Sequence, residues 1–185
     1  TYGINENATS RNINTAGISR NYKGSYDSEQ VSLKIGGGAP SQMSNGAFIT
    51  TFASVTGTEI KTDSYTETSS TTNDNLRLKI DQDDVISIVG SVGFKVHKVY
   101  DKGTPFFSLA INNEFGDDTI NNTNTYQGGG TAFKTTTAVE ELSATLGLGY
   151  SYGTDSTSIE FAYEADANDD DYLSHYGSIK IVGKF

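Results

Sequence analysis

The sequence predicts an all-β fold, an antiparallel up-and-down transmembrane β-barrel, on the strength of three observations. Apolar side chains alternate with polar ones over several segments that reach the roughly 9–11 residues needed to cross a bilayer as a strand. Charged and polar side chains collect on one face of each predicted strand. Short connections alternate with long, polar ones, which is the layout of outer-membrane barrels with tight periplasmic turns and long extracellular loops.

Length, cysteine content and net charge exclude several classes of protein and of binding site. The chain has 185 residues, no cysteine and a formal net charge of −10. This length suits one domain or a large part of one, and we expect residues 1–185 to form the C-terminal portion of a single outer-membrane barrel domain. The absence of cysteine excludes a disulfide framework and a thiolate metal site. The acidic balance argues against a nucleic-acid partner, and no apolar run approaches the ~18 residues of a transmembrane helix. Because the chain begins with Thr1, it is expected to be a mature product or a piece of something longer.

Three segments of the first half predict strands. Residues 1–8 are compatible with the end of one strand. Val31, Leu33 and Ile35 oppose Gln30, Ser32 and Lys34 in the next. Segment 46–60 is also predicted as a strand, but its faces are ambiguous because Phe48 and Phe52 have the opposite parity to Ile49, Ala53 and Val55.

The second half predicts five clearer strands, at 85–98, 105–115, 139–152, 156–165 and 177–185. Helical spacing would mix the apolar and polar sets of 139–152, so a helix is unsuited to that segment. Two sets of side chains follow from these alternations. The residues expected to face lipid are Leu142, Leu146, Leu148, Ile86, Ile88, Val92, Phe94, Leu109, Ile159 and Phe161. The residues expected to face the lumen are Lys95, Asn112, Glu114, Glu141, Glu160, Glu164 and Lys180.

Connections and glycines complete the barrel prediction. Short turns are expected at 39–45, 100–104 and 153–155, and long polar loops near 9–25, 61–75, 116–137 and 166–174. The lumen charges are expected to be solvated rather than paired, since exposed ion pairs contribute only ~0–1 kcal/mol. Four glycines are expected to permit strand curvature, namely Gly90, Gly93, Gly147 and Gly149. The alternative interpretation is that they leave space for an aromatic ring of the neighbouring strand.

The C-terminus predicts an assembly signal. The chain ends on Phe185, and small or apolar residues precede it at intervals of two, namely Gly183, Ile181, Ile179 and Gly177. This resembles the C-terminal signal of bacterial outer-membrane proteins, which implies recognition by the barrel-assembly machinery.

The last hundred residues resemble the C-terminal translocator domain of autotransporters (type V secretion). The resemblance rests on Val89-Gly-Ser-Val-Gly-Phe94, on the segment 104–115, on Leu142-Ser-Ala-Thr-Leu-Gly-Leu-Gly-Tyr-Ser-Tyr152, on 159–164 and on the Phe-ended strand. It implies a twelve-stranded barrel with a helix through its pore, of which this chain holds seven to eight strands and no plug helix. It also implies a location in the bacterial outer membrane with extracellular loops. The implied partners are membrane lipid and lipopolysaccharide, the barrel-assembly machinery and a passenger domain of the same protein that is exported or anchored at the cell surface.

Candidate chemical motifs give no enzyme, cofactor or metal prediction. Asp166, Asn168 and Asp170 have the spacing of a calcium loop, but Asp171 stands where glycine is required and Gly177 where glutamate is required. Glu160 and Glu164 lie about 13 Å apart on a strand, too far for paired acid–base work. His97 and His175 show no ligand spacing, and Gly128–Gly130 lacks the lysine of a phosphate loop.

Three other classes stay open. The first is a self-contained eight-stranded outer-membrane barrel that acts as an adhesin or structural protein, which a signal peptide directly before Thr1 would favour over a long passenger. The second is an outer-membrane phospholipase, for which neither histidine has an evident partner. The third is a soluble lipid-binding barrel or sandwich, whose apolar face would be enclosed.

Overall fold

The described regular structure consists of antiparallel strands, which confirms the all-β prediction. The computed structural model describes residues 1–15, 17–71, 74–153, 157–168 and 172–183. Among these residues no helix is long and apolar enough to cross a membrane. Eight strands of 11 residues or more form the main path in the order β1-β2-β3-β7-β8-β11-β12-β13. Their bounds are β1 (Tyr2–Thr15), β2 (Ile18–Gln42), β3 (Phe48–Thr62), β7 (Val85–His97), β8 (Thr104–Glu114), β11 (Leu142–Gly153), β12 (Thr157–Asn168) and β13 (Leu173–Gly183).

These eight strands correspond one for one to the eight predicted segments. Period-2 alternation located the strands of the second half, because each has one apolar and one polar face over most of its length. β1 and most of β2 are polar on both faces, and the sequence located only parts of them, at 1–8 and 30–35. The tight turns overlap the predicted ones: β2 extends to Gln42, into the turn predicted at 39–45, before β3 begins at Phe48, and β7 ends at His97 before β8 begins at Thr104. Part of the predicted 153–155 turn lies outside the described residues.

The predicted long loops are wrong in three places, because much of their length is strand. Residues 9–25 belong to the β1–β2 hairpin, and five further short strands lie within or next to the segments 61–75 and 116–137. These are β4 (Tyr65–Thr66), β5 (Thr68–Ser69), β6 (Leu78–Gln82), β9 (Thr119–Tyr126) and β10 (Phe133–Ala138). Strands such as Thr119-Ile-Asn-Asn-Thr-Asn-Thr-Tyr126 carry Thr and Asn on both faces, so they show no apolar alternation although Thr favours extended backbone.

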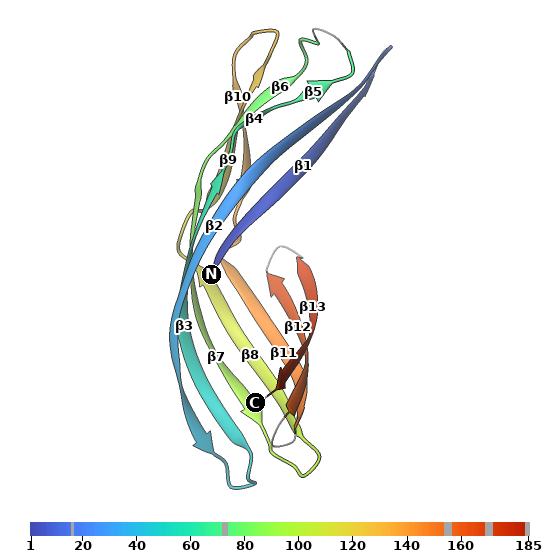
Figure 1. Ribbon diagram of the computed structural model, residues 1–185. Coiled ribbons are helices and arrows are strands. Elements are labelled where there is room, and N and C mark those ends of the chain that lie inside the picture. The colour runs from blue at the N-terminus through green and yellow to red at the C-terminus, as the bar shows by residue number, and fades with distance from the viewer. Residues whose placement is uncertain (16, 72–73, 154–156, 169–171, 184–185) are drawn as a thin grey trace. The chain divides into compact units, whose positions relative to one another are not determined.

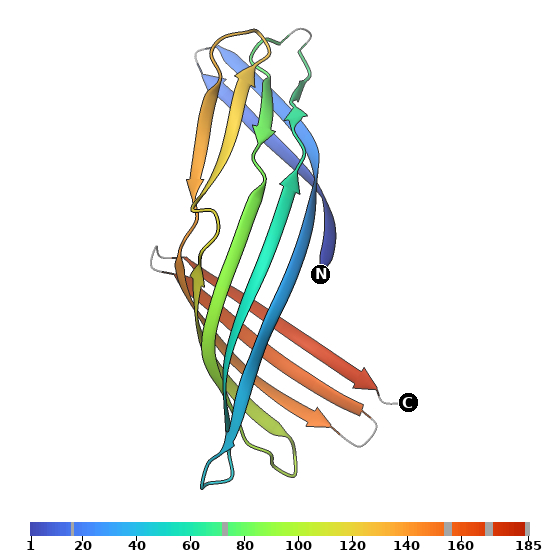
Figure 2. The same cartoon turned by 90° about the vertical axis from the view of Figure 1, so that its left-hand side faces the viewer.

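The chain divides into two compact units. The first contains residues 1–33, 57–87 and 116–139, and the second contains 34–56, 88–115 and 140–185. In the first unit β5 pairs with β2, and a separate sheet has the order β10-β9-β6-β4. Figure 2 shows β9 and β10 side by side in this unit.

In the second unit β7, β8, β11, β12 and β13 form an antiparallel sheet in that order, each strand pairing with its neighbour (Figure 1). We call this sheet the β7–β13 meander; between β8 and β11 the chain passes through β9 and β10 of the first unit. Antiparallel neighbours satisfy each other's backbone N–H and C=O groups.

Few apolar side chains are buried. The buried hydrophobic residues among the described ones are Tyr22, Ala47, Leu78, Ile80 and Ala110. By contrast, large apolar side chains such as Leu148, Phe161 and Ile179 are exposed. The apolar side of the β7–β13 meander is therefore exposed, unlike the enclosed apolar face of a soluble sandwich.

Candidate functional site

Strand register sorts the side chains of the second unit into two faces. Residues directly opposite each other in an antiparallel pair lie on the same side of the sheet. Phe94 is opposite Leu109, Leu109 opposite Leu146, and Leu146 opposite Ala165. One residue along, Lys95 is opposite Ser108, Ser108 opposite Gly147, and Gly147 opposite Glu164. We call the first set the apolar face and the second the polar face.

The apolar face is the more exposed of the two. The exposed fraction is 60% for Val92, 50% for Phe161 and 67% for Ile179. The residues predicted to face lipid all have the parity of this face on their strands. Seven of them are exposed, namely Leu142, Leu146, Leu148, Ile86, Ile88, Val92 and Phe161, and the other three, Phe94, Leu109 and Ile159, are half-buried.

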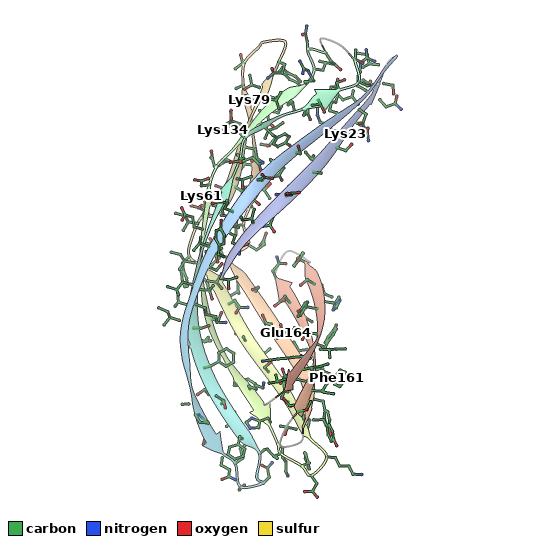
Figure 3. All side chains as sticks on the ribbon, viewed as in Figure 1. Lys23, Lys61, Lys79, Lys134, Phe161 and Glu164 are labelled. Carbon is green, nitrogen blue, oxygen red and sulfur yellow. The ribbon has the colours of Figure 1, made fainter. Side chains whose placement is uncertain are left out.

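The polar face carries the residues predicted to face the lumen, with one exception. Lys95, Asn112, Glu114, Glu160, Glu164 and Lys180 lie on strands with the parity of this face. Glu141 precedes β11, and its carbonyl oxygen accepts a hydrogen bond from the Glu114 amide at 2.7 Å. Figure 3 labels Phe161 and Glu164 on β12. These two residues are three positions apart along the strand, so their side chains lie on opposite faces.

Hydrogen bonds run across the polar face. The Asn112 amide donates to Thr145 Oγ1 at 2.9 Å, and Thr145 Oγ1 donates to Asp166 Oδ1 at 2.5 Å. The ion pairs found among the described residues all lie in the first unit. None of them joins Lys95 or Lys180 to a carboxylate of the polar face.

A hollow of about 790 Å³ opens on the polar face of the second unit. Its lining combines charged side chains, Lys95, Glu160 and Glu164, with aromatic ones, Phe52 and Phe106. The Lys95 ammonium lies 3.8 Å from the centroid of the Phe106 ring, and His97 stacks on Phe48 at 5.3 Å. A cation held over a ring face is attracted by the ring's quadrupole.

Sequence reasoning missed these aromatic rings on the polar face. The signal was present at Phe106-Phe107, because two adjacent residues of a strand cannot both lie on the apolar face. The ambiguous parity of 46–60 is also resolved. Thr50 and Phe52 line the polar hollow, whereas Ala53 and Val55 line a hollow on the apolar side with Val92 and Ile111.

Glycines make room for aromatic rings at several positions of the second unit, including Gly93, where a Cβ would lie 2.8 Å from the Phe52 ring. A Cβ on Gly149 would overlap the Phe106 ring, and one on Gly90 would lie 2.9 Å from Phe115. At Gly147 the nearest group is the hydroxyl of Ser108, which is not aromatic. Accommodation of rings therefore accounts for Gly149 and Gly90, in addition to any effect on curvature.

Four of the five residues of the predicted assembly signal lie among the residues that the structure describes. Gly183, Ile181, Ile179 and Gly177 lie on β13 opposite Thr157, Ile159, Phe161 and Tyr163 of β12. Ile181 and Ile179 thereby join the apolar face, while Phe185 lies outside the described residues. The recognition of this strand by an assembly machinery stays a prediction.

The first unit contains a buried polar cluster that the sequence did not reveal. Arg11 Nε and Nη2 donate to the two Glu67 carboxylate oxygens at 2.8 and 2.6 Å. Glu67 Oε2 also accepts from the Leu78 amide at 2.8 Å, and the Arg11 guanidinium lies 4.4 Å from the centroid of the fully buried Tyr22 ring. Bidentate geometry and a second donor compensate the desolvation of the glutamate.

Asp74 is the second buried carboxylate of this cluster. Its Oδ2 accepts from Ser69 Oγ at 2.9 Å, its Oδ1 accepts from the Leu76 amide at 3.1 Å, and Arg20 Nε lies 3.6 Å away. Burial by itself would raise the pKa of Asp74, but these hydrogen bonds and the arginine charge together lower it below its ordinary value. Burial raises the pKa of Tyr22. The cluster joins the β1–β2 hairpin to the segment that contains β5 and β6.

No group of three or more His, Asp or Glu side chains among the described residues is arranged to hold a metal ion. Asp169–Asp171, part of the acidic segment that lacks the glycine and glutamate of a calcium loop, lie outside the described residues.

Comparison with known families identifies the family of this sheet with one apolar and one polar face. The sequence model described as Autotransporter beta-domain matches residues 1–164. The chain belongs to the autotransporter beta-domain family. A search of curated proteins finds no match.

Membership in the autotransporter beta-domain family confirms the resemblance inferred from the second half of the chain, and it extends the likeness to the N-terminal strands. The match ends before β13. Autotransporter beta-domains are outer-membrane translocator barrels of type V secretion rather than typical enzymes, so this chain is an outer-membrane translocator component.

Proposed function

We propose that this autotransporter beta-domain exports an N-terminal passenger to the bacterial surface or anchors it there. The apolar face of the second unit contacts the hydrocarbon of the outer membrane, and the polar face lines a hydrated lumen. The single observation that carries this proposal is the exposure of the apolar face in continuous cross-strand rows. Exposed apolar surface is unfavourable in water by about 25 cal/mol per Å² and is stable in lipid.

The height of the apolar band supports a membrane position. On β7 it runs from Ile86 to Val96 on alternate residues. Ten residue steps at ~3.3 Å give about 33 Å along the strand, which becomes roughly 25 Å along the bilayer normal at the usual tilt of barrel strands. That is the height of the lipid-facing band in outer-membrane barrels.

The polar face suits an extended polar chain in transit. It presents hydroxyls, an amide and charges of both signs, including Asn112, Lys95 and Glu164, and glycines that carry no side chain. This polar face can form hydrogen bonds to water and to the backbone of a chain that is being exported.

The strands of the first unit are suited to water rather than to lipid. β9 bears Thr and Asn, β10 bears Thr on both of its faces, and all six residues of β10 are exposed. Lipid requires at least one apolar face from a spanning strand, so we place these strands on the extracellular side, in contact with lipopolysaccharide headgroups. We assign delivery of the chain to the membrane to the barrel-assembly machinery.

A charge placed on each face of one strand tests the proposal. Leu146→Arg puts a cation on the apolar face near the middle of β11, and we expect it to lower the stability of the inserted protein by about 2–4 kcal/mol. Ser151→Arg puts the same cation on the polar face of β11, opposite Glu160, and we expect normal insertion. Insertion is measured by heat-modifiable mobility in gels after folding into vesicles.

Equal tolerance of the two arginines would contradict the assignment of the faces. Failure of Ser151→Arg with normal insertion of Leu146→Arg would reverse it.

A further inference from the structure

We propose that the tip of the β7–β8 hairpin is a preorganised binding site for the phosphate headgroup of an anionic phospholipid, formed by Lys98, Tyr100 and Lys102. This inference rests on the proposed function, because it requires the second unit to be inserted in a bilayer.

The hairpin tip is a tightly bonded turn. Tyr100 and Gly103 exchange both of their backbone hydrogen bonds, at 3.0 and 3.1 Å, and the Lys98 amide donates to the Pro105 carbonyl at 3.4 Å. Asp101 and Lys102 are therefore the two residues at the bend. Their backbone is fixed by bonds on both sides rather than free to move.

A side chain of the next strand holds this tip in place. Tyr150 on β11 donates a hydrogen bond from its hydroxyl to the Lys102 carbonyl. Gly103 has φ +136°, and a Cβ there would lie 2.6 Å from Tyr150 Cζ. Glycine is thus required both by the backbone angle and by the ring that packs against it. The position of Lys102 is set before any ligand arrives, which reduces the entropy lost on binding.

Lys98 has the parity of the apolar face, and Lys102 follows it at the bend of the hairpin. Alternation continues from Val96 to Lys98 and Tyr100, while Val99 between them lines the hollow of the polar face. The Lys98 ammonium lies 5.4 Å from the centroid of the Tyr100 ring, and that ring is 55% exposed.

The chemistry of this surface matches a membrane interface. Tyrosine at the end of an apolar band belongs at headgroup depth, and Tyr150 and Tyr152 lie at the same end of β11. Two lysines outweigh Asp101, so the tip carries positive charge in a chain whose formal net charge is −10. A lysine near an anionic bilayer surface strengthens association about five-fold, the equivalent of roughly 1 kcal/mol.

The absence of tryptophan from the chain allows a direct measurement. The full chain carrying Tyr152→Trp is folded into phosphatidylcholine vesicles that contain a minority of brominated phosphatidylglycerol or, in parallel, brominated phosphatidylcholine. We expect the indole fluorescence to be quenched several-fold more strongly by the brominated phosphatidylglycerol. Lys98→Gln with Lys102→Gln should make the two quenchers equal.

Two further variants separate the site from general effects. Lys134→Gln removes an exposed lysine of the first unit and should leave the preference unchanged. Tyr150→Phe keeps the ring but removes the hydroxyl bond to Lys102, and it should weaken the preference without loss of insertion.

Equal quenching by the two lipids in the Tyr152→Trp protein, or an unchanged preference when the two lysine substitutions are added to it, would overturn the inference while leaving the proposed function intact. Failure of the Tyr152→Trp protein and of the unsubstituted chain to insert, with no heat-modifiable band for either, would instead overturn the proposed function.

Discussion

Gly149 and Gly147 lie two residues apart on β11 and have the same parity, yet their surroundings differ. Gly149 is packed under the Phe106 ring, and a Cβ there would also lie 2.6 Å from the Phe161 carbonyl oxygen. Near Gly147 the obstructing atom is the Ser108 hydroxyl, which can rotate away. A single methyl group therefore meets an immovable neighbour in one case and a movable one in the other.

We predict that Gly149→Ala destabilises the inserted protein by about 1–3 kcal/mol, the usual effect of overpacking. Gly147→Ala is the matched control and should be close to neutral. Urea unfolding of protein in vesicles, followed by gel mobility, provides the measurement. Similar losses in both variants would show that glycine acts there through strand flexibility and not through the Phe106 ring.

Asp74 predicts a pH dependence for the first unit. A carboxylate whose pKa is lowered by folding stabilises the fold fully above its ordinary pKa of 3.8, and this stabilisation is lost as the pH falls through the lower value of the folded state. Asp74→Asn removes the charge that faces Arg20. We expect the variant to be less stable than the parent at neutral pH, and the difference to shrink below pH 3.8.

Hydrogen exchange at the Leu76 amide, which donates to Asp74, reports this directly. A difference between parent and variant that stays constant from neutral pH to strongly acidic pH would contradict the prediction.

Single strands differ in how far their sequence determines them. The alternation in β7, β8, β11 and β12 is complete enough to assign both faces from the order of the residues alone. β9 and β10 have no such alternation, and their composition predicts loop. They are strands because β9 pairs with β10 on one side and with β6 on the other, and the pairing with β6 depends on a segment far along the chain.

The C-terminal strand β13 is predicted to act as a whole in assembly of the protein into the membrane. Its apolar residues Ile179 and Ile181 share the apolar face with β12, and the sequence motif continues to Phe185. We predict that deletion of Phe185 reduces assembly into the outer membrane in cells. Heat-modifiable mobility of the membrane fraction is the measurement, and deletion of the exposed, β10-flanking Thr131 is the control. Normal assembly without Phe185 would remove the assembly-signal interpretation.

The molecule as a whole is expected to have a fixed orientation, with its polar strands outside the cell and its tight turns in the periplasm. The chain has no cysteine, so a single introduced thiol reports its own exposure. We predict that Lys134→Cys in the first unit is labelled by a membrane-impermeant maleimide on intact cells. Lys102→Cys at the β7–β8 tip should be labelled only after the outer membrane is opened.

Labelling of the Lys102→Cys variant but not of the Lys134→Cys variant on intact cells would indicate the reverse orientation. Labelling of neither, with both reactive after detergent treatment, would show that the chain does not reach the surface.

The sequence by itself determined the class of the protein, the positions of seven clear strands and a possible eighth, and the two faces of those in the second half. These properties follow from a period of two along one strand, which is a local pattern. It also identified the autotransporter resemblance, because the motifs that carry it are continuous segments.

Only the tertiary structure decided which residues meet. Arg11 and Glu67 are 56 residues apart, Phe106 reaches Gly149 from a neighbouring strand, and Tyr150 holds a turn that ends at Gly103. Such contacts depend on the register between distant strands, and a shift of one residue would move every side chain to the other face. Local alternation cannot specify that register, because it is set by the pairing of whole strands.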